Sequence, residues 1–181
     1  MRLFVAIWPP QEVLDQLQPV VARLTEAIGR QGVRFAKPEK IHLTLRFLGD
    51  VADEDVPKLV DALAANLQGV QIGEVAVAGI GTFPGPGRPG IVWAGLKGQF
   101  TSVHERVVEA TEGLGDSKPL VPHLTLARVS PPSQKVGRAL QPVAHEAGAS
   151  VLAVWTPNEV VLVQTLPGGA YERVATFPLA S

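Results

Sequence analysis

The feature that most constrains this chain is a four-residue sequence, His-Leu-Thr-Leu, which occurs at residues 42–45 and again at residues 123–126. Each copy lies in a short stretch where apolar and polar residues alternate, which predicts a β-strand. Successive side chains of a strand point to opposite faces, so each His shares a face with the Thr two positions later. Two such strands that face each other would hold one tetrahedral group between two imidazoles and two hydroxyls.

Strict alternation also assigns the neighbouring residues to faces. The first strand divides into an apolar and a polar set: Ile41, Leu43, Leu45 and Phe47 against His42, Thr44 and Arg46. In the second strand, Arg128 falls on the face of Leu124 and Leu126, away from His123, unless a β-bulge brings it round. Two arginines are therefore candidates for contacting an anion, Arg46 by its position and Arg128 only in an irregular strand.

The periodicity of the remaining chain predicts an α+β protein. Helices are expected at 11–28, 53–67, 100–114 and 134–145, and further strands at 2–7, 33–35, 70–82, 91–96, 151–155, 160–166 and 171–177. Pro19 should kink or break the first helix, and Asp53 should cap the second. Each half reads as a strand, a helix, a His strand and a helix, then paired strands, which predicts one domain over residues 1–181 with two similar lobes.

Charge and cysteine content limit the function further. The 16 basic and 17 acidic residues give a net charge of −1, so a broad, backbone-tracking nucleic-acid binder is not expected. The chain has no cysteine, which excludes disulfides and thiol catalysis and fits a reducing compartment. The apolar run at residues 3–8 is too short for a signal peptide or a membrane span. We therefore expect a soluble, cytoplasmic protein with no membrane partner.

The two motifs and their flanks resemble the 2H phosphoesterase superfamily, and in particular the bacterial and archaeal RNA 2′,3′-cyclic phosphodiesterases, also called 2′-5′ RNA ligase-like proteins. The matching segments run through the chain: Arg2–Ile7, His42–Gly49, Arg88–Leu96, Pro122–Arg128 and Leu162–Leu179. This resemblance implies a bilobal α+β fold with an approximate two-fold axis. Two antiparallel sheets would line a central cleft, and the helices would lie outside.

His42 and His123 are the predicted catalytic pair. Opening a cyclic phosphate needs a base that activates water and an acid that protonates the departing sugar oxygen, and histidine supplies both forms near neutral pH. The hydroxyls of Thr44 and Thr125 are expected to bind the non-bridging phosphate oxygens. The nearly symmetric motifs leave open which His is the acid and which the base.

The resemblance implies three further properties. Arg128 would contact the substrate phosphate, with Arg46 kept as an alternative cation. The 3′ oxygen would leave, so the product would be a 2′-phosphomonoester. Reversal with a 5′-hydroxyl in place of water would form a 2′-5′ linkage, although hydrolysis should dominate because ligation needs two aligned RNA ends.

Phe83, at the start of a Gly/Pro-rich loop, is a candidate for stacking on a base, and the alternative is that this loop is only a connector. The other aromatic and imidazole side chains are expected to be structural: Trp8, Trp93 and Trp155 in the core, His104 and His145 on the surface. The loop lacks the Lys-Ser/Thr of a phosphate-binding P-loop, so use of a nucleoside triphosphate has no support.

Three alternatives stand beside the predicted RNA-end hydrolase. A metal site would need a third protein ligand, and neither His strand carries an acidic residue near its motif, so we expect no metal and no cofactor. Another 2H activity would act on a small cyclic phosphate, such as an ADP-ribose derivative, or on an oligoadenylate. A non-catalytic module would bind RNA ends without turnover. The expected partners are RNA ends or short oligonucleotides with a 2′,3′-cyclic phosphate, bound by a monomer.

Overall fold

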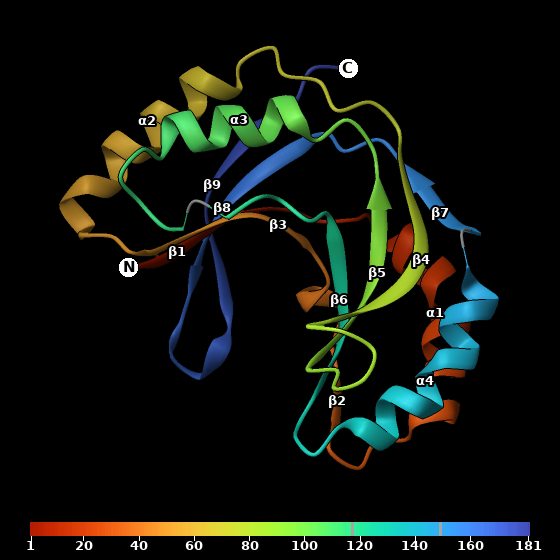
Figure 1. Cartoon of the computed structure of the whole chain (residues 1–181). Helices are drawn as coiled ribbons and strands as arrows, with labels where there is room; N and C mark the ends of the chain where they lie inside the picture. Colours follow the sequence, from red (N-terminus) through yellow and green to blue (C-terminus); the bar gives the residue numbers. More distant parts are fainter. Residues whose placement is uncertain (117, 149) are drawn as a thin grey trace.

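A computed structural model describes residues 1–116, 118–148 and 150–181 and shows two antiparallel sheets with helices on their outer sides (Figure 1). The first sheet has the strand order β3 (Leu43–Asp50), β1 (Arg2–Ile7), β8 (Glu159–Thr165), β9 (Tyr171–Pro178). The second sheet has the order β2 (Val33–Phe35), β6 (His123–Val129), β5 (Ile91–Lys97), β4 (Val75–Phe83), β7 (Val151–Trp155). The predicted α+β class with two antiparallel sheets is confirmed.

The four α-helices cover one face of each sheet. Helices α2 (Val56–Leu67) and α3 (Thr101–Ala110) pack on each other and on the first sheet. Helices α1 (Gln11–Ile28) and α4 (Gln134–Ala147) pack on each other and on the second. Short 3₁₀ turns lie at Pro38–Lys40, Asp53–Asp55 and Pro167–Gly169. In the part of the chain that the structure describes, each sheet therefore has an outer face covered by α-helices and an inner face that no α-helix covers (Figure 1).

One buried apolar cluster joins the two sheets. It includes Val5 and Leu162 from the first sheet and Val92 and Leu124 from the second, all 0% exposed. Fully burying a side chain of this kind contributes about 1.5–3 kcal/mol, so a core shared between the sheets holds the two lobes together strongly. This shared core is consistent with one domain of two lobes over residues 1–181, which stays a prediction.

The lobes do not correspond to the two halves of the sequence. In the first sheet, the N-terminal strand β1 pairs with β3 on one side and, on the other, with β8 from the C-terminal end of the chain, which pairs in turn with β9. In the second sheet, β2, which precedes the first motif, pairs with β6, which carries the second. The order of elements along the sequence suggested that each half forms its own lobe. Instead, each sheet contains strands from both halves of the sequence.

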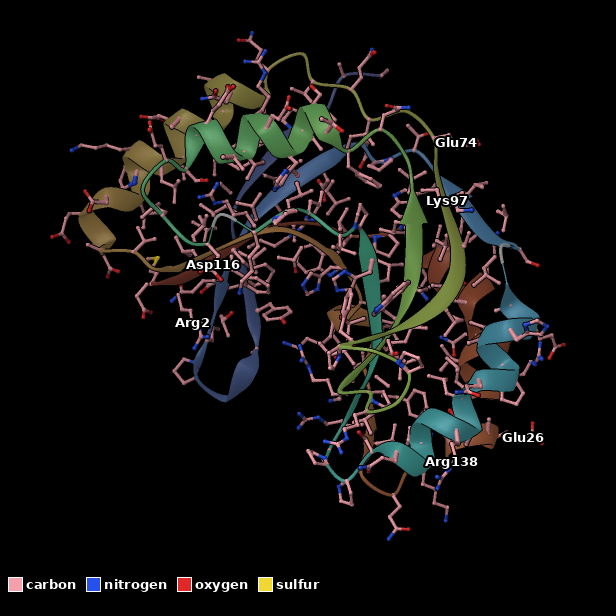
Figure 2. The ribbon with its side chains drawn as sticks, viewed as in Figure 1. Arg2, Glu26, Glu74, Lys97, Asp116 and Arg138 are labelled. Carbon is pink, nitrogen blue, oxygen red and sulfur yellow. The ribbon has the colours of Figure 1, made fainter. Side chains whose placement is uncertain are left out.

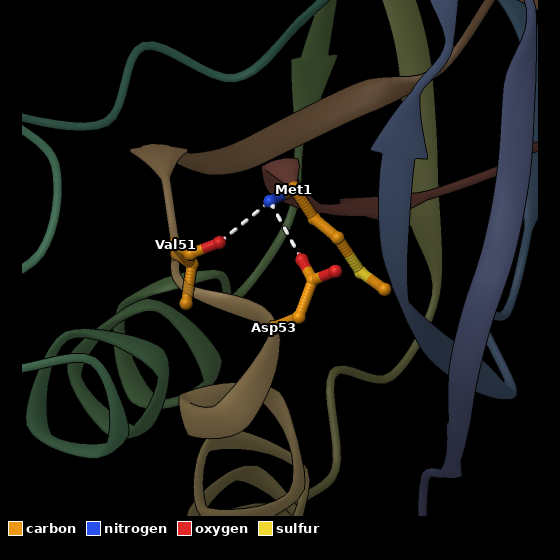
Figure 3. A network of polar contacts seen from close by, with 3 residues as sticks. All are labelled: Met1, Val51 and Asp53. Atoms are coloured by element: carbon orange, nitrogen blue, oxygen red, sulfur yellow. Dashed lines mark hydrogen bonds and ion pairs between the residues drawn. The ribbon is translucent and has the colours of Figure 1, made fainter.

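Two local expectations concern α1 and α2. Helix α1 is not broken at Pro19, and a kink there stays a prediction. Pro19 lies on the exposed side of the helix, where water can solvate the carbonyl group that lacks an amide partner. Asp53 does not cap α2. The Met1 ammonium donates to the Asp53 carboxylate over 3.3 Å and to the Val51 carbonyl over 2.6 Å (Figure 3). Asp53 instead begins the 3₁₀ turn, and these contacts tie the start of β1 to the segment after β3.

Within the described residues, no helix has both the length and the apolar character needed to cross a bilayer.

Candidate active site

The inner face of the first sheet carries an aromatic cluster. Phe4, Ala6, Val161 and Val163 are buried there, and Trp8 packs against them. The His42 ring, one residue before β3, lies 5.2 Å from the Phe4 ring, 4.7 Å from Trp8 and 5.4 Å from Tyr171, between ring centroids. His42 is thus held among rings by packing.

This environment keeps His42 neutral at pH 7. Burial lowers the pKa of His42 from 6.5 to about 4, because the cation loses its hydration. The backbone carbonyl of Lys40 opposes this effect and raises the pKa by a smaller amount. The contact is not a well-formed hydrogen bond, because the buried Nδ1 of His42 has no hydrogen-bond partner among the described residues. The positive charges of Lys40, His123 and Arg128 lower the pKa further. An anion bound beside His42 would oppose these effects and raise the pKa.

His123 is the first residue of β6, on the inner face of the second sheet. Its Nδ1 lies 2.6 Å from the carbonyl oxygen of Val121, so Nδ1 carries a proton and Nε2 is free for a ligand. The ring packs edge-on against Phe83 at 5.0 Å and lies 6.3 Å from Trp93. In both motifs, the carbonyl two residues before the His lies beside the imidazole.

The strands that carry the two motifs lie near each other. Strands β3 and β6 approach each other although they belong to different sheets. The charges of His123 and Arg128, both from the second sheet, act on His42 in the first. An anion placed between the sheets would therefore meet both imidazoles.

Both His strands contain a β-bulge at the same position of the motif. Thr44 lies opposite Ala6 and Arg46 lies opposite Val5, so Leu45 is an extra residue. In β6, the residue pairings skip Leu126 in the same way. Both threonines are half-buried and lie on the inner faces, opposite Ala6 and Trp93. Beyond the bulge, however, the alternation of faces is shifted by one residue.

The bulge removes Arg46 from the His42 face, where alternation had placed it. Arg46 lies opposite Val5, whose side chain belongs to the shared core, and its Nη2 donates to the Leu114 carbonyl over 2.6 Å. Phe47 instead lies on the His42 face, opposite Phe4. Its side chain is 64% exposed, whereas alternation had placed it on the apolar face with Leu43 and Leu45. The expected faces of both residues were wrong because the bulge was not foreseen.

The corresponding bulge brings Arg128 onto the His123 face. Arg128 is exposed and lies opposite Ile91, which shares the inner face with Trp93. Ala127 takes the buried face instead, at 0% exposure. The prediction from strict alternation is again wrong, and the bulge named as the alternative is the arrangement found. Arg128 and Phe47 each stand five residues after their motif His, so they occupy equivalent positions in the two lobes.

Sequence reasoning missed part of the aromatic lining. Trp8 and Trp93 were expected in the core but are half-buried beside the two imidazoles, whereas Trp155 is buried as predicted. Tyr171 was not among the predicted site residues. The Lys40 ammonium lies 3.3 Å above the centroid of its ring. For Trp93 a signal existed in the sequence. Val92 and Ala94 form the apolar set of β5, which leaves Trp93 on the other face.

Two other expectations concern single residues. Phe83 ends β4 rather than lying in the loop, and its ring lies beside His123 and 5.3 Å from Trp93. His104 is partly buried rather than solvated, and burial and the nearby Arg46 charge lower its pKa. His145 is exposed, as predicted.

The described residues contain no group of three or more His, Cys, Asp or Glu side chains arranged to hold a metal ion. Two surface hollows lie away from the histidines. One is bounded by α2, α3 and the end of β3, the other by α2 and β9, and no histidine lines either. The candidate site is therefore located here by its side chains.

Comparison with known proteins agrees with this geometry. The model of the LigT-like phosphoesterase family matches residues 7–93. An RNA 2′,3′-cyclic phosphodiesterase of Archaeoglobus fulgidus is 32% identical over 151 residues, covering 81% of this chain and 83% of that protein. The crystal structure of TT0787 from Thermus thermophilus has a TM-score of 0.75 at 25% identity and covers 99% of this chain and 98% of its own. E. coli LigT, solved with 3′-AMP, has the same fold, with a TM-score of 0.72 at 19% identity and the same coverage, 99% and 98%.

Proposed function

From the premise that this chain belongs to the LigT-like family of 2H phosphoesterase enzymes, we propose that it hydrolyses RNA ends carrying a 2′,3′-cyclic phosphate to 2′-phosphomonoesters. The observation that carries the proposal is the pair of half-buried His-x-Thr motifs on the inner faces of two sheets, with the charges of His123 and Arg128 acting on His42. The substrate class follows the name of the Archaeoglobus fulgidus relative.

Hydrolysis needs one imidazole on each side of the phosphorus. One of His42 and His123 takes a proton from water as its oxygen attacks phosphorus, and the other gives a proton to the departing O3′. The attacking and leaving oxygens lie roughly in line, so a base and an acid from opposing sheets meet the two ends of the reaction axis. Burial and, to a smaller extent, positively charged neighbours keep His42 neutral, and a bound phosphate would make its protonation easier.

The remaining groups hold the phosphate in place. Thr44 and Thr125 donate their hydroxyl protons to the non-bridging oxygens, and Arg128 balances the charge that builds on them in the transition state. Phe83 stacks on a base of the RNA end from its place beside His123. Arg46 has no part in this scheme, because its guanidinium is bonded to the Leu114 carbonyl on the outer side of the first sheet.

Cleavage at O3′ leaves the phosphate on O2′. The reverse reaction joins the cyclic phosphate to a 5′-hydroxyl and forms a 2′-5′ linkage through the same two proton transfers. Hydrolysis dominates, because water is abundant and ligation requires two RNA ends aligned in one site. The enzyme works as a monomer in the cytoplasm without a metal or a cofactor, and the lack of cysteine fits that compartment.

Turnover of a short RNA with a 2′,3′-cyclic phosphate tests the proposal, with EDTA present throughout. Loss of either imidazole in His42→Ala or His123→Ala should lower kcat/KM by about 10²–10⁴-fold, the usual contribution of one acid or base. His145→Ala is the matched control, because this exposed imidazole lies on α4 of the outer layer and should turn over like wild type. The product should resist a phosphatase specific for 3′-phosphates.

Three results would count against the proposal. A folded wild-type protein that leaves RNA ends intact but cleaves an oligoadenylate or a small cyclic phosphate would move the activity to another 2H substrate. Binding that survives loss of either imidazole, without turnover, would make the protein an RNA-end binding module. Turnover that stops in EDTA and returns with a metal would replace the two-histidine mechanism.

A further inference from the structure

Two arginines of neighbouring strands lie opposite each other beside the candidate site. Arg34 of β2 is the antiparallel partner of Arg128 of β6. The flanking pair, Val33 and Val129, is buried at 7% exposure each, so both arginines point to the opposite, inner face. Both are exposed. Arg34 therefore extends the inner-face row that includes Arg128 by one strand. Strand β2, which carries it, is the edge strand of the second sheet.

Two arginines opposite each other repel, unless a carboxylate or a bound anion balances their charges. Side chains directly opposite each other on antiparallel strands have Cβ atoms about 4.5–5.5 Å apart, and like charges in such pairs destabilise the sheet. Among the residues that the structure describes, neither guanidinium forms an ion pair with a carboxylate. In a chain of net charge −1, two adjacent uncompensated cations indicate an anion-binding position.

Both arginines lie along the sheet from the catalytic pair. With the bulged Leu126 discounted, four strand steps separate His123 from Arg128, roughly 13 Å at about 3.3 Å per residue. Arg34 lies directly beside Arg128 on the neighbouring strand, about 4.8 Å to the side and toward the sheet edge. Arg128 is thus the nearer of the two arginines to His123, and Arg34 widens the cationic position toward the edge of the sheet.

We propose that Arg34, together with Arg128, binds the internal phosphodiester that precedes the cyclic phosphate, so that the enzyme recognises an RNA chain and not only its last nucleotide. This inference rests on the proposed function and adds a second phosphate subsite to it. The position of β2 at the sheet edge leaves the RNA a path to solvent beyond Arg34. Nothing in the subsite reads a base, so this contact is independent of sequence.

Binding of two matched ligands tests the subsite without requiring turnover. Adenosine 2′-phosphate carries only the terminal group, and the dinucleotide ApA with a terminal 2′-phosphate adds one nucleoside and one internal phosphodiester. The readout is the ratio of their Kd values, measured by calorimetry. In Arg34→Gln the gain from the added nucleotide should shrink by about tenfold, the scale of one charge-assisted hydrogen bond. The slope of log K against log salt for the dinucleotide should fall by about 0.7.

Two controls separate the contact with phosphate from other effects. Arg138→Gln removes an exposed arginine from α4, on the outer side of the second sheet (Figure 2), and should keep the wild-type ratio. A dinucleotide with a neutral methylphosphonate at the internal position keeps both bases but loses the charge. Wild type should bind it at least as weakly as Arg34→Gln binds the natural dinucleotide. The loss of affinity caused by the methylphosphonate should be smaller in Arg34→Gln than in wild type, because only Arg128 then remains to contact the charged phosphate.

An unchanged Kd ratio in Arg34→Gln would overturn the subsite. Equal weakening of both ligands would also overturn it, because Arg34 would then act on the terminal phosphate or on the fold. Failure of wild type to hydrolyse the cyclic forms of both ligands, with an Arg34-dependent Kd ratio retained, would overturn the proposed function and leave the second phosphate site standing.

Discussion

The low pKa of His42 predicts that this imidazole makes the folded protein less stable in acid. Above pH 6.5, His42 is neutral in the folded and the unfolded chain and contributes nothing. Between pH 6.5 and pH 4, the unfolded chain takes up a proton that the folded one, with its pKa of about 4, does not. The unfolded state then binds more protons, so the free energy of unfolding falls as the pH falls, until both states are protonated below pH 4.

The size of this effect follows from the shift. A change from 6.5 to about 4 corresponds to about 3 kcal/mol once complete. At pH 5, linkage gives about 2 kcal/mol, and at pH 7.5 it gives almost none. In His42→Asn, which has no titrating group there, this loss should be absent. The free energy of unfolding of the variant, relative to wild type, should therefore rise by about 2 kcal/mol between pH 7.5 and pH 5.

Urea unfolding of both proteins across this pH range measures the difference, and other titrating groups cancel in the comparison. The variant can be less stable than wild type at pH 7.5, because it loses ring contacts with Phe4 and Trp8. Only the change with pH carries the prediction. His145→Asn, at an exposed position, controls for loss of an imidazole as such. Curves for His42→Asn and wild type that stay parallel down to pH 4 would refute the reasoning.

Two further predictions concern the outer side of the first sheet. Gly115→Ala should lower the free energy of unfolding by more than about 2 kcal/mol, because Gly115 has a φ of +67° and a Cβ there would overlap the Phe47 carbonyl oxygen. Gly87→Ala, where a Cβ meets nothing within 4 Å, should stay within about 0.5 kcal/mol in the same urea titration; equal losses would contradict the packing. Arg46→Met should raise the pKa of His104 in an NMR titration, since the Arg46 charge lowers it. An unchanged His104 pKa would mean that burial alone sets it.

The sequence predicted most elements of the fold because the relevant signals are local. Alternation marked β6 and β5, and helical spacing marked α1 and α4 close to their observed bounds. The strand pairing was less accessible. That β2 joins β6, and β8 joins β1, depends on contacts between segments more than 90 residues apart, which no local pattern records.

Alternation predicted the correct face for each residue from the His to the Thr of both motifs, but not for the residues that follow. His42, Thr44, His123 and Thr125 lie on the inner faces as alternation predicts. The bulges follow immediately afterwards, and a bulge depends on the partner strand as well as on the residues it contains. For that reason Arg46 was placed on the wrong face.

The bulges also give the nearly symmetric site a direction. They turn equivalent positions to the inner faces, and these positions carry different groups, an exposed aromatic ring at Phe47 and a cation at Arg128. Because both positions are solvent-facing, they can differ without changing the packed core. The two orientations that the paired histidines alone would allow are therefore not equivalent, because an aromatic ring borders one end of the site and a guanidinium the other.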